Sequence, residues 1–89
     1  MAVPSQAIGD TLLRLLAQRD PHASLCPSEV ARALDGDEDG WRALMPQVRE
    51  VAALMIADGR LQACQRGRPA DIHSAVGPIR LRRGPRFPE

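Results

Sequence analysis

The sequence has no lysine and no tyrosine, and Trp41 and Phe87 are its only residues of the Phe, Trp and Tyr group. All twelve basic residues are therefore arginine, which we treat as a compositional bias and as weak evidence on partners. Because aromatic residues are so scarce, the core must consist of Leu, Val, Ile, Met and Ala. A chain of 89 residues can bury one small core, so a single domain is expected.

Long apolar runs and clustered cysteines are also missing. No stretch approaches the roughly 18 apolar residues of a membrane helix, and Asp10 and Arg14 interrupt the first apolar stretch, which argues against a cleaved secretory signal. The two cysteines, Cys26 and Cys64, fit a reduced compartment, and there is no Cys-x-x-Cys motif. We therefore expect a cytoplasmic protein that contacts no membrane.

Acidic and basic residues are unevenly distributed along the chain. Residues 60–89 carry seven arginines against two acids, a net charge of +5, whereas residues 1–59 carry five arginines against nine acids, a net charge of −4. The overall net charge of +1 hides this polarity. The basic half predicts a contact surface for phosphate or for an acidic protein partner.

Apolar residues at helical spacing predict two helices in the first part of the chain. The first covers residues 5–19, with Ser5 as its expected N-cap. The second covers residues 27–34 and begins with proline, which suits a first helical turn. Glu29 is placed to close a capping box in which Cys26 replaces the usual Ser or Thr.

The third predicted helix is the longest. Its apolar stripe spans residues 41–58, and Gly59 is placed to end it in a left-handed conformation. The preceding turn, residues 35–40, holds four acids and two glycines, and Asp37 or Asp39 would cap the helix. Pro46 lacks a backbone donor and predicts either a kink or a separate first turn before the main helix.

Alternating apolar and polar residues predict two strands after the third helix, one with Leu61 and Ala63 facing the core and one with Ile79 and Leu81 facing it. A short strand is also expected over residues 23–25. Residues 66–77 are long for a hairpin turn and rich in Gly, Pro and polar residues, as in the wing of a winged helix.

The predicted fold is an α+β winged helix, with a three-helix helix-turn-helix core and a C-terminal β-hairpin wing, over residues 1–83. Residues 84–89 are expected to form a flexible tail, unless Phe87 docks on the body of the protein. No internal repeat and no second domain are evident.

Four motifs carry a family resemblance: Cys26-Pro27-Ser28-Glu29-Val30-Ala31, the line from Trp41 to Arg49, the turn Gln65-Arg66-Gly67-Arg68-Pro69 with Asp71, and the strand from Gly77 to Arg82. Together they resemble a family of small bacterial proteins known only as domain of unknown function 3253. The resemblance implies a winged-helix-like fold. It offers no catalytic residues to carry over, because no activity is established for the family.

In a winged helix the third helix enters the major groove and the wing contacts the DNA backbone or minor groove. The candidate nucleic-acid-binding residues are Arg42 and Arg49 on the outward face of the third helix, and Arg66, Arg68, Arg80 and Arg82 in the wing and its closing strand. The alternative is that these arginines are solvated, and that those of the hairpin keep an edge strand soluble. The acidic turn at residues 35–39 would repel phosphates and disfavours tight, sequence-specific binding by a monomer.

Other site classes have little support. His22, Cys26, Cys64 and His73 supply four possible metal ligands, but only the first two have the spacing of a ligand pair, so no metal is expected. We find no phosphate-cradling glycine loop, nucleophile elbow or acid/base pair, and we therefore expect no enzyme activity, no cofactor and no small-molecule substrate. Two functions stay open: a module that binds DNA weakly or non-specifically, associated with transcription, and a protein-interaction module that holds an acidic partner without binding nucleic acid.

Overall fold

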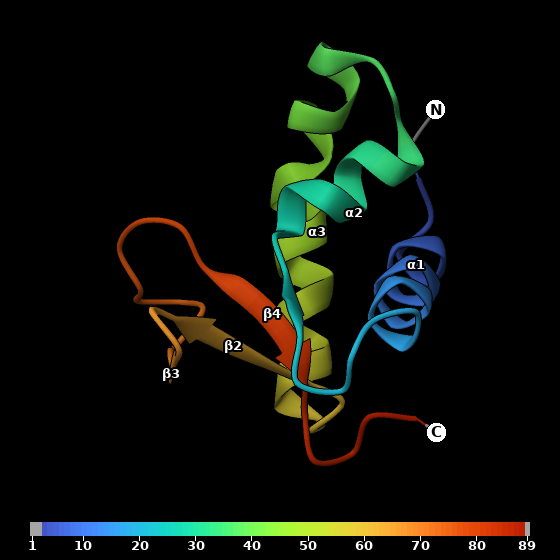
Figure 1. The fold of residues 1–89 in the computed structure, drawn as a ribbon. Coiled ribbons are helices and arrows are strands. Elements are labelled where there is room, and N and C mark those ends of the chain that lie inside the picture. Colours follow the sequence, from blue (N-terminus) through green and yellow to red (C-terminus); the bar gives the residue numbers. More distant parts are fainter. Residues whose placement is uncertain (1–2, 89) are drawn as a thin grey trace.

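The computed structural model describes residues 3–88 and contains three helices and four short strands in that range (Figure 1). The strands form one antiparallel sheet in the order β1-β4-β2-β3. The α+β class predicted from the sequence is therefore confirmed. In chain order the elements are α1 (Ser5–Ala17), β1 (Ser24–Leu25), α2 (Pro27–Leu34), α3 (Glu38–Ala57), β2 (Leu61–Gln65), β3 (Arg68–Pro69) and β4 (Arg80–Arg83).

The start of α1 differs from the prediction. Pro4 is the N-cap, and its carbonyl oxygen accepts the N–H groups of Ala7 at 3.0 Å and Ile8 at 3.3 Å, whereas Ser5 is already helical. The prediction of Ser5 as the cap was wrong, because the extended backbone of Pro4 supplies the first acceptor without a side-chain bond. The helix ends at Ala17, two residues before the predicted end.

Helix α2 has the predicted bounds, and its first turn is held by Glu29. The Glu29 carboxylate accepts the backbone N–H of Cys26 at 2.7 Å and also pairs with Arg19, which follows α1. One acidic side chain thus caps α2 and ties it to the end of α1.

Helix α3 begins at Glu38, three residues earlier than predicted, because the Asp37 side chain accepts the N–H of Gly40 at 3.1 Å and stabilises an additional turn. It continues through Pro46 as a single helix rather than starting there. Gly59 ends it as predicted, with φ at +87° and with Arg60 N–H donating to the Met55 carbonyl at 2.9 Å, which is the bonding of a Schellman motif.

Strand β4 lies between β1 and β2 and forms antiparallel pairs with both. Leu81 is opposite Leu25 on β1 and opposite Ala63 on β2, and all three side chains are buried. Ile79 is buried as predicted but precedes the strand, which begins at Arg80.

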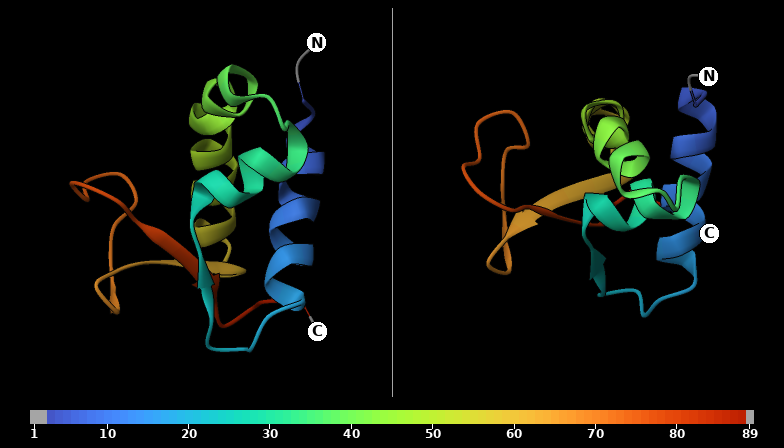
Figure 2. Two further views of the ribbon diagram at one scale, coloured as in Figure 1. Left: turned by 45° about the horizontal axis from the view of Figure 1, so that its top comes forward. Right: turned by 90° about the horizontal axis from the view of Figure 1, so that it is seen from above.

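The 66–77 segment is more ordered than a plain loop. Arg66 and Gly67, with φ at +54° and +78°, form a two-residue turn that returns the chain as β3, and β3 pairs with the end of β2. A further turn over residues 71–74 leads towards β4. Figure 2 shows that β2, β3 and this segment project away from α1.

The core lies between the three helices and the helix-facing side of the sheet. Its largest fully buried side chains are Ile8, Leu12, Leu16, Leu25, Val30, Val48, Met55, Leu61, Ile79 and Leu81. Phe87 packs against this core, and the Arg86 N–H donates to the Gly59 carbonyl at 2.8 Å, so the residues after β4 are held on the body; Glu89 lies outside the described residues. Among residues 3–88 no helix is both long and apolar enough to cross a membrane.

Candidate arginine-rich interface

The structure separates the six candidate arginines by what their side chains already bind. Arg66 and Arg68 are exposed at the β2–β3 turn, and within residues 3–88 neither makes an ion pair or a side-chain hydrogen bond. Their positions are fixed by the backbone of a tight hairpin rather than by side-chain partners. They are therefore charged groups that an external anion can reach without displacing a protein partner.

Arg80 and Arg82 lie on β4 and have partners on the neighbouring strands. Arg80 donates from Nε to the Ser24 hydroxyl at 2.7 Å and from Nη2 to the Ser24 carbonyl at 3.0 Å, which links β4 to β1. Arg82 donates from Nε to the Gln62 side-chain oxygen at 2.9 Å, across to β2. Each guanidinium holds the sheet together and keeps only its remaining N–H groups for a ligand.

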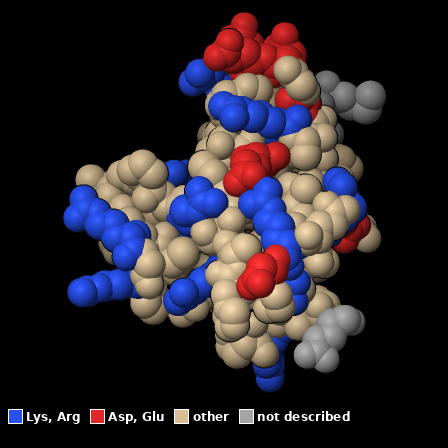
Figure 3. All heavy atoms as spheres, viewed as in Figure 1, with Lys and Arg blue, Asp and Glu red and all other residues tan. Residues whose placement is uncertain are grey.

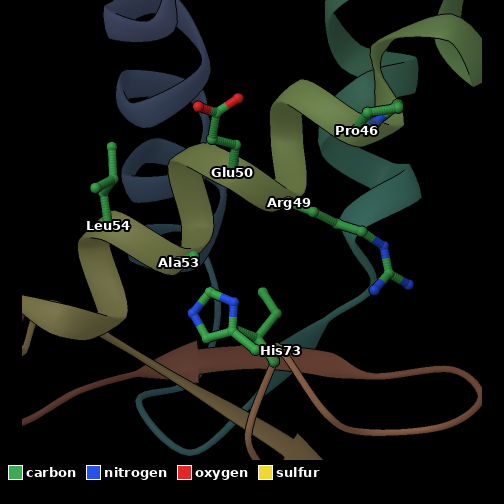
Figure 4. Close-up of a pocket in the computed structure, with 7 residues that line it drawn as sticks. Pro46, Arg49, Glu50, Ala53, Leu54 and His73 are labelled. Atoms are coloured by element: carbon green, nitrogen blue, oxygen red, sulfur yellow. The ribbon is translucent and has the colours of Figure 1, made fainter.

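The two candidates on α3 are also unequal. Arg42 pairs with Glu38 one turn earlier at 2.9 Å and lies over the Trp41 ring, 4.8 Å from its centre. Arg49 has no ion pair within the described part of the chain. It borders a groove of about 400 Å³ between α3 and the 71–74 turn, which is lined by Pro46, Arg49, Glu50, Ala53, Leu54, Ile72 and His73 (Figure 4).

A second cavity, of about 380 Å³, brings Arg66 and Arg80 together. It is lined also by Cys26, Gln65, Val76, Gly77, Pro78 and Ile79. The Gln65 amide holds its rim, because Nε2 donates to the carbonyl of Val76 at 2.6 Å and to that of Pro78 at 3.2 Å. Two guanidinium groups and one amide thus border a hollow with largely apolar walls.

Two cysteines and two histidines were considered as metal ligands, and the structure does not gather them. Within residues 3–88 no three His, Cys, Asp or Glu side chains form a group that could hold a metal ion. Cys26 and Cys64 are free, and the described part of the chain contains no disulfide between them.

Acidic side chains gather at one end of the molecule, whereas basic side chains are spread more widely. Figure 3 shows acidic side chains at the start of α3, at the top, and basic side chains beside them, over the rest of this face and on the projecting sheet at the left. The acidic group comes from the 35–39 turn, where Asp35, Asp37, Glu38 and Asp39 lie close together in the chain. An anion approaching the molecule is therefore attracted to the sheet end and repelled from the start of α3.

Basic charge also lowers one carboxyl pKa near the sheet. The pKa of Glu29 is held below its ordinary value, first by the hydrogen bond from Arg19 and further by the Cys26 N–H and the charges of Arg19 and Arg80. Burial opposes this shift in part. Glu29 therefore stays ionised, and its negative charge offsets part of the positive charge of Arg19 and Arg80.

Arg83 is a structural arginine that sequence reasoning did not distinguish from the others. Its Nη2 donates to the carbonyl oxygens of Leu16 at 3.0 Å and Arg19 at 3.1 Å, one in the last turn of α1 and one just after it. Alternation along β4 places Arg83 on the same side as the buried Leu81 and Arg82 on the opposite side, and the position of α1 then supplies the carbonyl oxygens that Arg83 binds.

Comparison with known proteins identifies the family but no activity. Residues 5–84 match the family described as "Protein of unknown function (DUF3253)", so the chain belongs to this family, as its motifs indicated. No curated protein matches the chain. The function must therefore be argued from the surface itself.

Proposed function

We propose that this protein is a winged helix that binds nucleic acid through phosphate contacts of its wing, with little dependence on base sequence. The element order supports the fold assignment: three helices with a short strand after the first, then a hairpin whose last strand pairs with that early strand. The wing is the 66–77 segment.

The observation that carries the proposal is the state of Arg66 and Arg68. Both are exposed, Arg66 in the two-residue β2–β3 turn and Arg68 at the start of β3, and neither has an internal side-chain partner within the described residues. Arg66 adopts a left-handed backbone, a conformation that costs a non-glycine residue about 1 kcal/mol and that Asn or Gly would adopt more easily. Arginine at a position that favours Asn or Gly is best explained if its positive charge has a function, such as contact with a phosphate.

Base-specific reading has less support. A recognition helix must present side chains to the groove, but the outer face of α3 offers one unpaired arginine, Arg49, next to Glu50, and the acidic turn stands at its start. Phosphate contacts position a protein without selecting sequence. We therefore expect weak, salt-sensitive binding of duplexes of any sequence.

The test is titration of a labelled duplex of random sequence at several salt concentrations. Each phosphate contact adds about 0.9 to the slope of log affinity against log salt. We expect a slope of about 2 to 4, and the double change Arg66→Ala and Arg68→Ala should reduce it by about 2, equally for unrelated sequences. Folded protein that binds no duplex at about 50 mM salt and at tens of micromolar concentration contradicts the proposal.

A protein-interaction role is the second candidate, because the same exposed arginines would hold an acidic protein segment. The basic side chains on the projecting sheet in Figure 3 would attract an acidic protein segment as well as they would attract nucleic acid. Binding of an Asp- and Glu-rich peptide that is abolished by the wing double change, with no duplex binding by the native protein, would support this candidate over nucleic acid.

A further inference from the structure

The cavity of about 380 Å³ beside β4 differs from the groove along α3 in the charges that line it. Its lining contains two arginines, Arg66 and Arg80, and no acidic residue. The groove along α3 instead has both Arg49 and Glu50 in its lining, so charges of both signs border it. A hollow whose charges all have one sign attracts ligands of the opposite sign. The lining of the 380 Å³ cavity therefore favours an anion.

Arg80 supplies a cation whose position is fixed. A guanidinium group has five N–H groups, and two of those on Arg80 donate to Ser24, from Nε to the hydroxyl at 2.7 Å and from Nη2 to the carbonyl at 3.0 Å. Three N–H groups, on Nη1 and Nη2, are left for a ligand. Because the bonds to Ser24 already orient this side chain, little of its freedom is lost when a ligand binds.

The turn at residues 76–78, which borders the cavity, is held by Gln65 at the end of β2. The Gln65 amide Nε2 donates to the carbonyl oxygens of Val76 at 2.6 Å and Pro78 at 3.2 Å. Gly77 has φ at +90°, a conformation that glycine adopts without strain, and this allows the chain to turn between those two carbonyls. The folded chain therefore forms the cavity without a ligand, as is usual for small-molecule sites.

Apolar groups complete the lining and indicate what the anion is attached to. Pro78 and the buried Ile79 border the cavity just before β4, and Cys26 borders it at the start of α2. Small-molecule sites measure about 300 to 1,000 Å³, so this cavity is at the lower end of the range. It therefore suits a ligand with a small apolar body attached to its anionic group.

The charges around the cavity favour a carboxylate over a phosphate as that anionic group. Arg66 makes no ion pair within residues 3–88. Glu29 offsets part of the charge of Arg80, since its pKa is lowered mainly by Arg19 and to a smaller extent by Arg80. A carboxylate carries one negative charge, whereas a phosphate monoester carries about 1.5 to 2 at pH 7. The parallel N–H groups of a guanidinium also match the two coplanar oxygens of a carboxylate.

We propose that this cavity is a binding site for a small organic carboxylate. Arg80 and Arg66 pair with the carboxylate group. The apolar body of the ligand lies against Pro78 and Ile79. The site goes beyond nucleic-acid binding and does not rest on it, although a bound carboxylate and a DNA phosphate would compete for Arg66.

The test is titration of the isotope-labelled full chain with sodium hexanoate, followed by NMR of the backbone amides. We expect a dissociation constant on the order of 1 mM, because the ligand has few atoms. The largest shifts should occur at Gly77, Ile79 and Arg80, which line the cavity, and amides of α1 should move little. A parallel titration with sodium chloride corrects for the added ionic strength.

Three related compounds separate the contributions of the charge and of the apolar body. Hexanamide lacks the negative charge, and acetate lacks most of the apolar body, so each should bind about tenfold more weakly than hexanoate. Hexyl phosphate keeps the apolar body but carries more negative charge. It should bind no more tightly than hexanoate.

A pair of variants tests the assignment of Arg66. Arg66→Ala should weaken hexanoate binding about tenfold, because a charged hydrogen-bond donor is lost. Arg68→Ala is the matched control, because Arg68 has the same charge in the same hairpin but does not line the cavity, and its dissociation constant should stay within about twofold of the native value. The amide spectrum of each variant also shows whether it is folded.

Each of three results would overturn the proposal. The first is the absence of shifts around the cavity up to about 20 mM hexanoate. The second is an equal loss of affinity in Arg66→Ala and Arg68→Ala, which would indicate a diffuse attraction of anions to the basic sheet. The third is binding of acetate as tight as that of hexanoate, or tighter binding of hexyl phosphate. None of these measurements contains nucleic acid, so they fail or succeed independently of the duplex titration.

Discussion

The guanidinium group of Arg83 lies over the ring of Phe87, 4.6 Å from its centre. The same group donates to the carbonyl oxygens of Leu16 and Arg19, so one arginine joins the end of α1, the last strand and the residues that follow it. The basic half of this chain therefore contains two kinds of arginine. One kind holds the fold together, and the other, at the β2–β3 turn, has no partner within residues 3–88.

Arg83→Ala should lower the free energy of unfolding by about 2 kcal/mol, because two hydrogen bonds from a charged donor and one stacking contact are lost. Urea denaturation followed by circular dichroism measures this change. Arg68→Ala is the control and should stay within about 0.5 kcal/mol of the native protein. Equal effects of the two changes would show that Arg83 has no special structural role.

Arg66→Asn should stabilise the protein while weakening its binding to nucleic acid. The change creates an Asn-Gly pair, the sequence that a two-residue turn with two positive φ angles favours, and should raise the free energy of unfolding by about 0.5 to 1 kcal/mol. Duplex titration should show the same loss of affinity as for Arg66→Ala. A destabilised Arg66→Asn variant would refute the turn argument, and unchanged duplex affinity would remove Arg66 from the binding surface.

Gly84→Ala should be strongly destabilising, by about 2 kcal/mol or more. A Cβ atom there would lie 2.3 Å from the Gly59 carbonyl oxygen and 2.8 Å from that of Leu61, and backbone atoms cannot move aside as a side chain can. Gly36→Ala is the matched control, because a Cβ atom at Gly36 meets nothing within 4 Å. Thermal unfolding of the two variants should differ by several degrees, and similar midpoints would contradict the close approach at Gly84.

The stability of the protein should fall at acidic pH through Glu29. Its pKa in the folded protein lies below the ordinary value of 4.5, mainly because Arg19 donates a hydrogen bond to the carboxylate. The stabilisation is therefore complete above pH 4.5 and is lost as the pH falls from there through the folded-state pKa. The Arg19–Glu29 pair is partly exposed to solvent, so we expect it to contribute about 1 kcal/mol to the free energy of unfolding.

Urea denaturation at several pH values measures this contribution. Glu29→Gln should be less stable than the native protein at pH 7, and the difference should shrink below pH 4.5. Asp10→Asn removes an exposed carboxylate and serves as the control. A Glu29→Gln deficit that is the same at pH 7 and at pH 3 would show that the ionised pair is not its cause.

Much of the fold was predictable because its signals are local. The bounds of α2, the capping role of Glu29 and the glycine after α3 depend on a few neighbouring residues, and all three predictions are confirmed. The errors were also local: an extended Pro4 replaced the expected cap, and the Arg66-Gly67 turn produced a strand where a loop was expected. A positive φ at an arginine is rare, so the sequence favours no such turn there.

The candidate site was predictable only in part. The excess of arginine after Gly59 is visible in the sequence, but the partners of Arg80 and Arg82 lie on strands distant in the chain. The groove between α3 and the 71–74 turn joins segments about 20 residues apart, and no period in the sequence indicates it. Side chains of one type thus acquire different roles through contacts that local patterns do not encode.

The sequence by itself determined the α+β class, the positions of the three helices, the half-buried strands and the separation of acidic from basic residues. These depend on spacing and composition, which act over a few residues. Only the tertiary structure decided which arginines remain available. Arg83 is bound to the end of α1 and Arg80 to β1, because β4 pairs with β1 and turns these guanidinium groups towards carbonyl oxygens. Arg66 and Arg68 stay in solvent, because the β2–β3 turn carries them at the far edge of the sheet, where β3 pairs with β2 alone.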